Sequence, residues 1–360
     1  MIWLFLTGLA LLTYSFHPII ERGIHLLDFT LYYYPTGYYL SQGLNPYHLP
    51  SGLLYSPPAL LIFQPLYYLP SQPTQLIWTL LSFLSLLLSL WLIIKLTKLK
   101  PQRKWFLLLS PFFFLSFPSK FTLGMGQINH FILLLFTSSF YLYQKKKKKL
   151  SALLLTLSFL IKLFPIWILL FFIQKKDWGY IKKLILYTFS AFLLSSLFLP
   201  LQMFKDYFTL VLPSFLTHAA NSSYYNQALT GLISRLVSHP PLQSSLATSL
   251  SLILIFLAWK KLQPKLSKHL KFSLLITLSL LISPVSWQHH LVFLFFPLVF
   301  LFAHFYSQKN LRGLSLTIIA YLLIFINIKN PQPFTTTLWG NLLLSHATLG
   351  SLLLYITILI

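Results

Sequence analysis

Long apolar runs that recur along the whole chain constrain its fold more than any other feature. Runs of about 17 to 25 residues alternate with short polar or basic segments, and a helix needs about 20 apolar residues to cross a bilayer. The chain is 56% hydrophobic and only 9% charged, with a mean hydropathy of +0.73. Soluble domains carry about 25% charged residues. The sequence therefore predicts an all-α polytopic membrane protein, formed by a single domain over residues 1–360.

Charge and cysteine content exclude several other classes. The net charge is +23, but the basic residues stand in short blocks between apolar runs, so they cannot form one surface that tracks the phosphates of a nucleic acid. The chain has no Cys, which excludes disulfides and thiolate metal sites. Residues 1–20 show neither a positive n-region nor a small-residue cleavage site, so we expect a retained first span.

The basic blocks predict how the spans are oriented. The expected spans lie near residues 2–20, 76–97, 105–118, 127–143, 184–200, 244–259, 272–284, 288–307, 313–328 and 340–360. With a cytoplasmic N-terminus, most of the 27 Lys and Arg residues fall in cytoplasmic connections, as the positive-inside rule requires. These blocks cover residues 95–104, 145–149, 175–183, 260–271 and 309–312.

One apolar segment, residues 150–173, does not fit a single crossing, because Lys clusters flank it at both ends. Two half-length helices that turn at "IKLFP" would keep both clusters inside, with Pro165 breaking the helix and Lys162 near the apex. An intramembrane Lys indicates a functional site, although it could instead snorkel or pair locally.

Four polar stretches then fall at the extracytoplasmic ends of spans: "LLDFTLYYY", "FTLGMGQINHF", "YYNQALTGLISRL" and "SPVSWQHHLV". The two long outer loops, residues 21–75 and 201–243, are too aromatic to be disordered. Loops longer than about 12 to 15 residues are otherwise usually functional. The site is therefore expected at the outer membrane interface.

Asp28 is the strongest candidate among the four acidic residues. Apolar and aromatic neighbours desolvate its carboxylate and raise its basicity, as a general base requires. A helix N-cap or a partner for an outer-loop Arg is the alternative. The other acids have local explanations. Asp177 is expected to be the counter-ion of a Lys-rich loop, and Asp206, with Lys205 beside it, suits an interfacial helix that lies on the membrane. Glu21 and Arg22 form an ordinary juxtamembrane pair.

Cations are equally sparse on the outer side. Arg235 could form a bidentate contact with a phosphate, and His289 and His290 lie where an outer turn meets the next span. Each of these motifs could also be no more than a polar turn cap. No metal site is expected, because adjacent His residues on a helix point in different directions and no carboxylate or thiolate cluster accompanies them.

Taken together and in this order, the stretches resemble glycosyltransferase family 87, whose members are polyprenol-phosphate-sugar-dependent, mannosyltransferase-like membrane enzymes of the GT-C fold class. The likeness covers about residues 25–300. It departs from the family pattern at Gln288, where an acidic residue is common, and at Ala228, where Ser is common. The matching residues are Asp28, Phe29, Tyr33, Tyr34, Gly43, Asn45, Pro46, Tyr47, Gly126, Gln127, Asn129, Lys162, Pro165, Asn226, Gln227, Gly231, Arg235, Ser283, Pro284, Ser286, Trp287, His289 and His290.

The resemblance implies a GT-C-type bundle of about 10–12 membrane helices, with short broken helices and long extracytoplasmic loops. It implies transfer of a hexose, with mannose the expected sugar, from a polyprenyl-phosphate donor to a lipid or glycan acceptor hydroxyl. The transfer would invert the anomeric carbon, without cofactor or metal, on the extracytoplasmic side of the plasma membrane. The expected partners are these substrates and membrane lipids, with no nucleic acid.

The resemblance also assigns roles to residues. Asp28 would be the catalytic base, and Arg235 with one of His289 and His290 would bind the donor phosphate, with Lys162 as a further candidate. The residues expected to contact substrate are Tyr33, Tyr34, Gln127, Asn129, Asn226, Gln227 and Trp287. A lipid or small-molecule transporter or flippase is the alternative function, because an intramembrane Lys and broken helices also suit a translocation path.

Overall fold

The structure is a computed structural model, and the parts it describes are helical. It describes residues 1–360 except 22–25, 51, 218–221 and 263–265, with no side-chain description at 15–21 and 216–217. Within these limits, the β-type pairing found is an isolated antiparallel bridge between Asn226 and Trp287. The all-α fold expected from the sequence is confirmed. The expected Glu21–Arg22 pair lies outside the residues whose side chains are described.

In the described part of the chain, three helices are long and apolar enough to cross a membrane: α4 (Ser71–Leu96), α14 (Pro240–Lys261) and the helix Gln288–Ser307. Two bent helix pairs raise the number to five if each counts as one span. The chain is thus a polytopic membrane protein. The larger number of membrane helices, about 10–12, stays a prediction, because several of the expected spans are helices shorter than a full crossing.

The chain divides into two compact units, and the segments of one unit alternate with those of the other along the sequence. Unit 1 comprises residues 1–92, 120–163 and 178–217, and unit 2 comprises residues 93–119, 164–177 and 218–360. The unit boundaries at 92 and 119 fall within helices α4 and α6. The single domain expected from the sequence stays a prediction.

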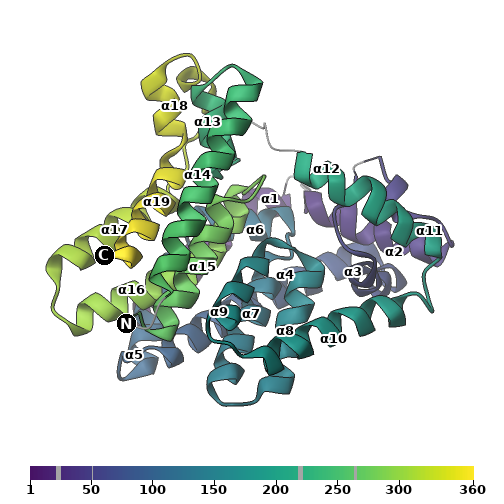
Figure 1. Cartoon of the computed structure of the whole chain (residues 1–360), viewed down its shortest axis with the longest axis horizontal. Coiled ribbons are helices and arrows are strands. Elements are labelled where there is room, and N and C mark those ends of the chain that lie inside the picture. Colours follow the sequence, from purple (N-terminus) through teal and green to yellow (C-terminus); the bar gives the residue numbers. More distant parts are fainter. Residues whose placement is uncertain (22–25, 51, 218–221, 263–265) are drawn as a thin grey trace. The chain divides into compact units, whose positions relative to one another are not determined.

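Unit 1 contains a helical hairpin, α7–α8, and many short helices (Figure 1). A tight turn closes the hairpin with Lys146 at φ 60°, and buried hydroxyl groups of Ser139, Ser151 and Tyr180 join it to α10. The helices of this unit are α1 (Ile2–Glu21), η1 (Phe29–Tyr33), α2 (Tyr34–Ser41), η2 (Pro46–His48), α3 (Pro57–Phe63), η3 (Gln64–Tyr68), most of α4 and α6 (Phe117–Met125), α7 (Asn129–Gln144), α8 (Lys148–Ile161), α10 (Trp178–Ser195), α11 (Leu201–Asp206), η5 (Tyr207–Val211) and α12 (Leu212–Thr217).

Unit 2 is organised around α15, whose residues from Leu270 to Leu281 are all buried. A helix that is buried on every side lies in the interior of a bundle. Figure 1 shows α13 and α18 side by side at one end of this unit. Its helices are α5 (Gln102–Phe114), η4 (Phe164–Ile168), α9 (Leu169–Gln174), α13 (Leu229–Leu236), α14, α15 (Lys268–Leu281), η6 (Gln288–Leu294), α16 (Phe295–Ser307), α17 (Leu311–Phe325), η7 (Gln332–Phe334), α18 (Leu338–Leu344) and α19 (His346–Leu359).

Helix breaks explain where the expected spans succeed and fail. The break predicted at "IKLFP" is confirmed, because α8 ends at Ile161, Lys162 is extended and the next helical segment begins at Phe164. The segment expected to span the membrane over 340–360 is apolar enough to do so only as a bent pair of helices. Helices α18 and α19 are bent by 64° at Ser345, where the polar sequence "SHAT" interrupts the apolar run.

The sequence interpretation of Asp206 is wrong. Asp206 is only 5% exposed, and its carboxylate accepts hydrogen bonds from Asn45 (2.6 Å) and Gln202 (2.6 Å) and lies 3.5 Å from the His48 ring. Lys205 does not pair with it, because adjacent residues on a helix point in different directions. Within unit 1, Asp206 therefore ties the two long connecting segments together through the "GLNPY" motif.

Candidate active site

The Asp28 carboxylate lies at the start of η1 and is almost enclosed, with 8% of the residue exposed. It occupies the position before the first residue of η1, yet its side chain makes no capping hydrogen bond. In the described part of the chain, no Arg pairs with it. The N-cap alternative considered for Asp28 is therefore wrong. A pairing with an outer-loop Arg stays open, because Arg22 lies outside the described residues.

The end of helix α6 brings Gln127 to Asp28. The Gly126 N–H bonds to the Leu123 carbonyl (3.1 Å) and the Gln127 N–H to the Thr122 carbonyl (2.8 Å), which is the Schellman pattern of a helix C-terminus. This pattern needs a left-handed residue, and Gly126 has φ +69°. A Cβ at Gly126 would lie 2.8 Å from side-chain atoms of residues 26 and 29. Glycine therefore lets this turn approach η1.

The Gln127 side chain joins Asp28 to Lys162. Its Nε2 donates to Asp28 Oδ2, while its Oε1 accepts from Tyr33 (3.0 Å) and from the Lys162 Nζ (3.4 Å). The Lys162 Nζ also donates to Asn129 Oδ1 at 2.7 Å. Five residues expected in the site from the sequence thus lie together in unit 1, on η1, the α6–α7 turn and the end of α8.

Burial raises the pKa of the Asp28 carboxyl above the ordinary value for an aspartate. The hydrogen bond from Gln127 and the positive charge of Lys162 oppose this rise and lower the pKa. Asp28 lies outside the candidate membrane spans. A carboxylate that is desolvated but held by one amide is a stronger base than an exposed one, which fits proton abstraction.

The substrate contact expected of Tyr33 is not what the structure shows. Tyr33 is fully buried, stacks on Phe63 with ring centroids 4.6 Å apart, and shares a 2.7 Å hydrogen bond with the hydroxyl of Tyr55. No face of its ring is left for a sugar, so its role is to hold the Oε1 of Gln127. Tyr34 is half-buried, with its hydroxyl donating to the Leu69 carbonyl at 3.0 Å. Its contact with substrate stays a prediction.

In unit 2, hydrogen bonds join two motifs that are distant in sequence, "NQALTG" and "SPVSWQ". The Gln227 N–H donates to the Ser286 carbonyl (2.7 Å), and the Ser286 N–H donates to the side-chain oxygen of Asn226 (3.0 Å). A Cβ at Gly231 would lie 2.2 Å from the Asn226 carbonyl oxygen, so only glycine allows α13 to begin this close. The "NQALTG" and "SPVSWQ" motifs thus support each other.

Arg235 stabilises the backbone around the first of these two motifs. Its Nε donates to the hydroxyl of Ser345 (2.9 Å), and its Nη1 donates to the carbonyls of Ser223 and Asn226 (2.9 Å each). Only Nη2 has no partner among the described residues. Arg235 therefore fixes the turn before α13, and the bidentate phosphate contact expected from the sequence would need N–H groups that are already engaged.

Gln227 is likewise an internal residue, so the substrate contact expected of it is not supported. It is 1% exposed, its Nε2 donates to the carbonyls of Tyr224 (2.6 Å) and Leu344 (2.8 Å), and its Oε1 accepts from the Thr348 N–H (3.0 Å). Both ends of the amide are used within unit 2. Asn226, which is fully buried, also accepts the Ala228 N–H (3.2 Å), so it too holds the backbone.

The two histidines lie at the start of η6. Their rings are nearly perpendicular with centroids 4.6 Å apart; His289 is buried, and His290 and Trp287 are half-buried. The Trp287 N–H donates to His290 Nδ1 (3.2 Å), which places a proton of the neutral ring on Nε2. The described residues contain no group of three potential metal ligands.

The sequence profile of glycosyltransferase family 87 matches residues 53–284. The chain belongs to this family. It is also 28% identical over 266 residues, 71% of this chain, to the polyprenol-phosphate-mannose-dependent alpha-(1-2)-phosphatidylinositol pentamannoside mannosyltransferase of Mycolicibacterium smegmatis, and it spans 62% of that relative's length. No solved structure matches the chain.

The family 87 match covers only part of the candidate site. Gln127, Asn129, Lys162 and the "NQALTG" motif lie inside residues 53–284, whereas Asp28 and the histidines lie outside. The roles of Asp28, His289 and His290 therefore depend on their own geometry and stay predictions.

Sequence reasoning missed the polar residues of the α18–α19 break. The Tyr224 hydroxyl lies 3.0 Å from His346 Nε2, and His346 Nδ1 lies 2.6 Å from the Leu323 carbonyl. Because a carbonyl only accepts, Nδ1 carries the proton and Nε2 accepts from Tyr224. The signal in the sequence was "SHAT", a polar interruption in an apolar run. It lies beyond both the family match and the sequence likeness.

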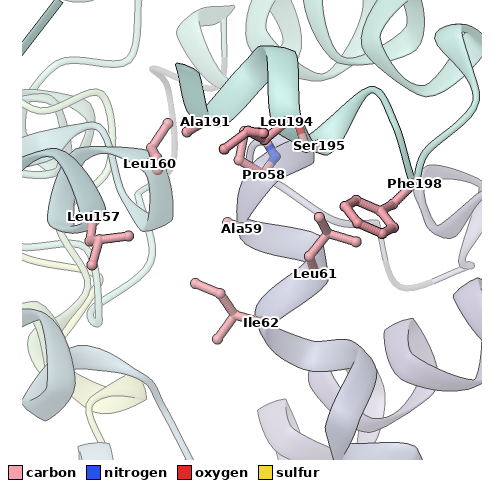
Figure 2. A pocket seen from close by; sticks show the side chains of 10 residues that line it. All are labelled: Pro58, Ala59, Leu61, Ile62, Leu157, Leu160, Ala191, Leu194, Ser195 and Phe198. Atoms are coloured by element: carbon pink, nitrogen blue, oxygen red, sulfur yellow. The ribbon is translucent and has the colours of Figure 1, made fainter. Parts of the chain in front are cut away.

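An apolar cavity of about 180 Å³ opens in unit 1 (Figure 2). Figure 2 shows side chains from α3, α8 and α10 around it, and Ser56, just before α3, donates to the Leu160 carbonyl at 2.5 Å. On α8, the lining of the cavity ends at Leu160, two residues before Lys162. The lining residues are Pro58, Ala59, Leu61, Ile62, Leu157, Leu160, Ala191, Leu194, Ser195 and Phe198.

Proposed function

We propose that this family 87 protein transfers a hexose, with mannose the first candidate, from a polyprenyl-phosphate donor to an acceptor hydroxyl. The acceptor would be a lipid or glycan on the extracytoplasmic side of the plasma membrane. Family membership and the mycobacterial relative support this class of reaction. The observation that carries the proposal is Asp28, because Gln127 holds its Oδ2 while Oδ1 takes no hydrogen bond from any described residue.

In the proposed reaction, Asp28 Oδ1 takes the proton of the acceptor hydroxyl as that oxygen attacks the anomeric carbon. The bond between the anomeric carbon and the donor phosphate oxygen breaks, and the polyprenyl phosphate leaves as an anion. A single displacement of this kind inverts the anomeric configuration. The leaving group is already a stable anion, so it needs cationic stabilisation more than a general acid.

For the donor phosphate, we propose one of His289 and His290, with Arg235 Nη2 as a further donor in the same unit. A neutral imidazole with Nε2 protonated can donate one hydrogen bond to a phosphate oxygen, and a protonated imidazole adds its charge. Lys162 has a different proposed role, because its ammonium already donates to Asn129 and Gln127. It belongs to the network that holds the base.

The apolar cavity between α3, α8 and α10 supports a lipid-linked substrate. Its lining is almost entirely aliphatic or aromatic, and one wall belongs to the helix that ends next to Lys162 (Figure 2). An isoprenoid or acyl chain can pack against such a lining through van der Waals contacts, without leaving a buried polar group unpaired.

The test is transfer of a labelled hexose from polyprenyl phosphate in membranes that contain the wild type, Asp28→Asn or Asp177→Asn. We expect Asp28→Asn to lose about 10²- to 10⁴-fold in kcat, as for loss of a general base, and Asp177→Asn to match the wild type. Full transfer by Asp28→Asn would contradict the base assignment. Movement of the labelled donor across vesicles without transfer to any acceptor would favour the transporter or flippase instead.

A further inference from the structure

The chain of hydrogen bonds from Lys162 to Asp28 contains an obligatory donor at one end and an obligatory acceptor at the other. An ammonium group can only donate, and an ionised carboxylate can only accept. Gln127 stands between them with its oxygen toward Lys162 (3.4 Å) and its amino group bonded to Asp28. In the described part of the chain, Asp28 and Lys162 form no direct ion pair. The two charged neighbours thus determine which way the amide points.

A side-chain amide is well suited to this position, because it donates from one end and accepts at the other. Tyr33 reinforces the orientation by donating to the same Gln127 oxygen at 3.0 Å, and the Schellman turn at Gly126 fixes the backbone. Asn129 takes the shorter hydrogen bond from Lys162, at 2.7 Å, and so holds the ammonium on the far side of the amide from Asp28. Every polar atom of the Gln127 side chain is engaged within unit 1.

We propose that Gln127 is a positioning residue, whose amide separates the Lys162 cation from the base Asp28 and directs the second carboxylate oxygen toward the acceptor. A direct ion pair would stabilise the carboxylate strongly and weaken it as a base. Through the amide, Lys162 orients the network at a distance, and only one oxygen of Asp28 is occupied. This inference rests on the proposed function of Asp28 and replaces the substrate contact expected of Gln127.

Among the described residues, the titratable groups that interact electrostatically with Asp28 are Tyr32, Tyr33, Tyr55 and Lys162. Burial raises the pKa of each of the three tyrosine hydroxyls, so they stay neutral wherever a carboxyl titrates. Lys162 contributes the one positive charge of this group. The pKa of Asp28 is therefore set by burial, which raises it, and by two contacts that lower it, the hydrogen bond from Gln127 and the charge of Lys162.

Two substitutions of nearly equal size separate positioning from packing. Gln127→Leu removes the N–H that stabilises the Asp28 carboxylate, so Asp28 should titrate at higher pH. Gln127→Glu places a second carboxyl beside Asp28. Because two neighbouring carboxyls share one proton, the pH at which Asp28 titrates should rise further, by about one pH unit or more. Gln72→Leu, at an exposed glutamine in the first turn of α4, is the matched control.

The titration can be read directly because the chain has only three aspartates, Asp28, Asp177 and Asp206. Carbon-13 labelling of aspartate carboxyls gives three signals, and the one lost in Asp28→Asn identifies Asp28. We expect it to titrate at higher pH in Gln127→Leu and higher again in Gln127→Glu, with no change in Gln72→Leu. An Asp28 titration that stays at the wild-type pH in both Gln127 variants would overturn the inference.

Transfer kinetics supply the second readout. We expect kcat to fall about 10- to 100-fold in Gln127→Leu at unchanged KM for the donor, with the acid limb of the kcat/KM profile moved to higher pH. A purely structural role would lower the amount of active protein and leave the limb in place, which would also overturn the inference. If wild-type protein transfers no sugar from any polyprenyl phosphate, the proposed function fails, while the carboxyl titration still decides the role of Gln127.

Discussion

Replacing Gln227 by Leu, which has a similar size and no polar atoms, should destabilise unit 2. The substitution leaves three backbone groups in the interior without partners: the carbonyls of Tyr224 and Leu344 and the N–H of Thr348. Each unsatisfied buried group costs about 1–3 kcal/mol, so the loss should reach about 3 kcal/mol at the least. At about 2–4 °C per kcal/mol, the apparent Tm should fall by roughly 6 °C or more.

The assay for Gln227→Leu is thermal unfolding of detergent-purified protein, followed by the fraction that stays monodisperse after heating. Gln332→Leu, at an exposed glutamine of the same unit, should leave the apparent Tm unchanged. Because membrane proteins often unfold irreversibly, all variants need the same heating rate. A normal Tm combined with a raised KM for donor or acceptor would refute the reasoning and restore Gln227 as a substrate contact.

Three further perturbations concern residues of unit 1. Gly126→Ala forces a left-handed Ala, at about 1–2 kcal/mol, and displaces Gln127, so transfer should fall more than thermal stability does; unchanged kcat would contradict this. Lys162→Met removes a charge that lowers the pKa of Asp28, so the pKa should rise and the acid limb of the kcat/KM profile should move to higher pH. An acid limb that stays in place or moves to lower pH would contradict this expectation. Asp206→Asn, in contrast, should make the protein easier to digest in limited proteolysis and leave the pH profile unchanged; a shifted profile would connect it to the site.

Apolar patterning predicts much of this fold, because the requirement to bury backbone polar groups in lipid restricts the chain to helices. The break at "IKLFP" is visible for the same reason, since charge flanks the segment on both sides and Pro165 cannot continue a helix. The burial of Asp28 can also be predicted from the sequence, because most residues on both sides of it are apolar or aromatic. Local chemistry decides these features.

Partners in space decide the remaining features, and sequence spacing cannot supply them. Asp206 stands next to Lys205 in the chain, yet its partners are Asn45, far away in sequence, and Gln202 on the same helix. Gln127 and Gln227 carry the same side chain in polar motifs, and only the geometry shows that both amides are used internally. Residues of one motif therefore cannot be assigned to substrate from their polarity.

Both engaged glutamines lie where the backbone leaves a helix or approaches one, at the end of α6 and just before α13. Lipid offers no hydrogen bonds to backbone groups exposed at such breaks. The Gln227 amide supplies them to three backbone groups, whereas the Gln127 amide bonds other side chains of its unit. A polar motif in a membrane enzyme thus indicates a helix break. It indicates a substrate contact only where one of its polar atoms has no hydrogen-bond partner within the protein. By this criterion Asp28 is a candidate in unit 1, because Gln127 holds one of its oxygens and no described residue bonds to the other.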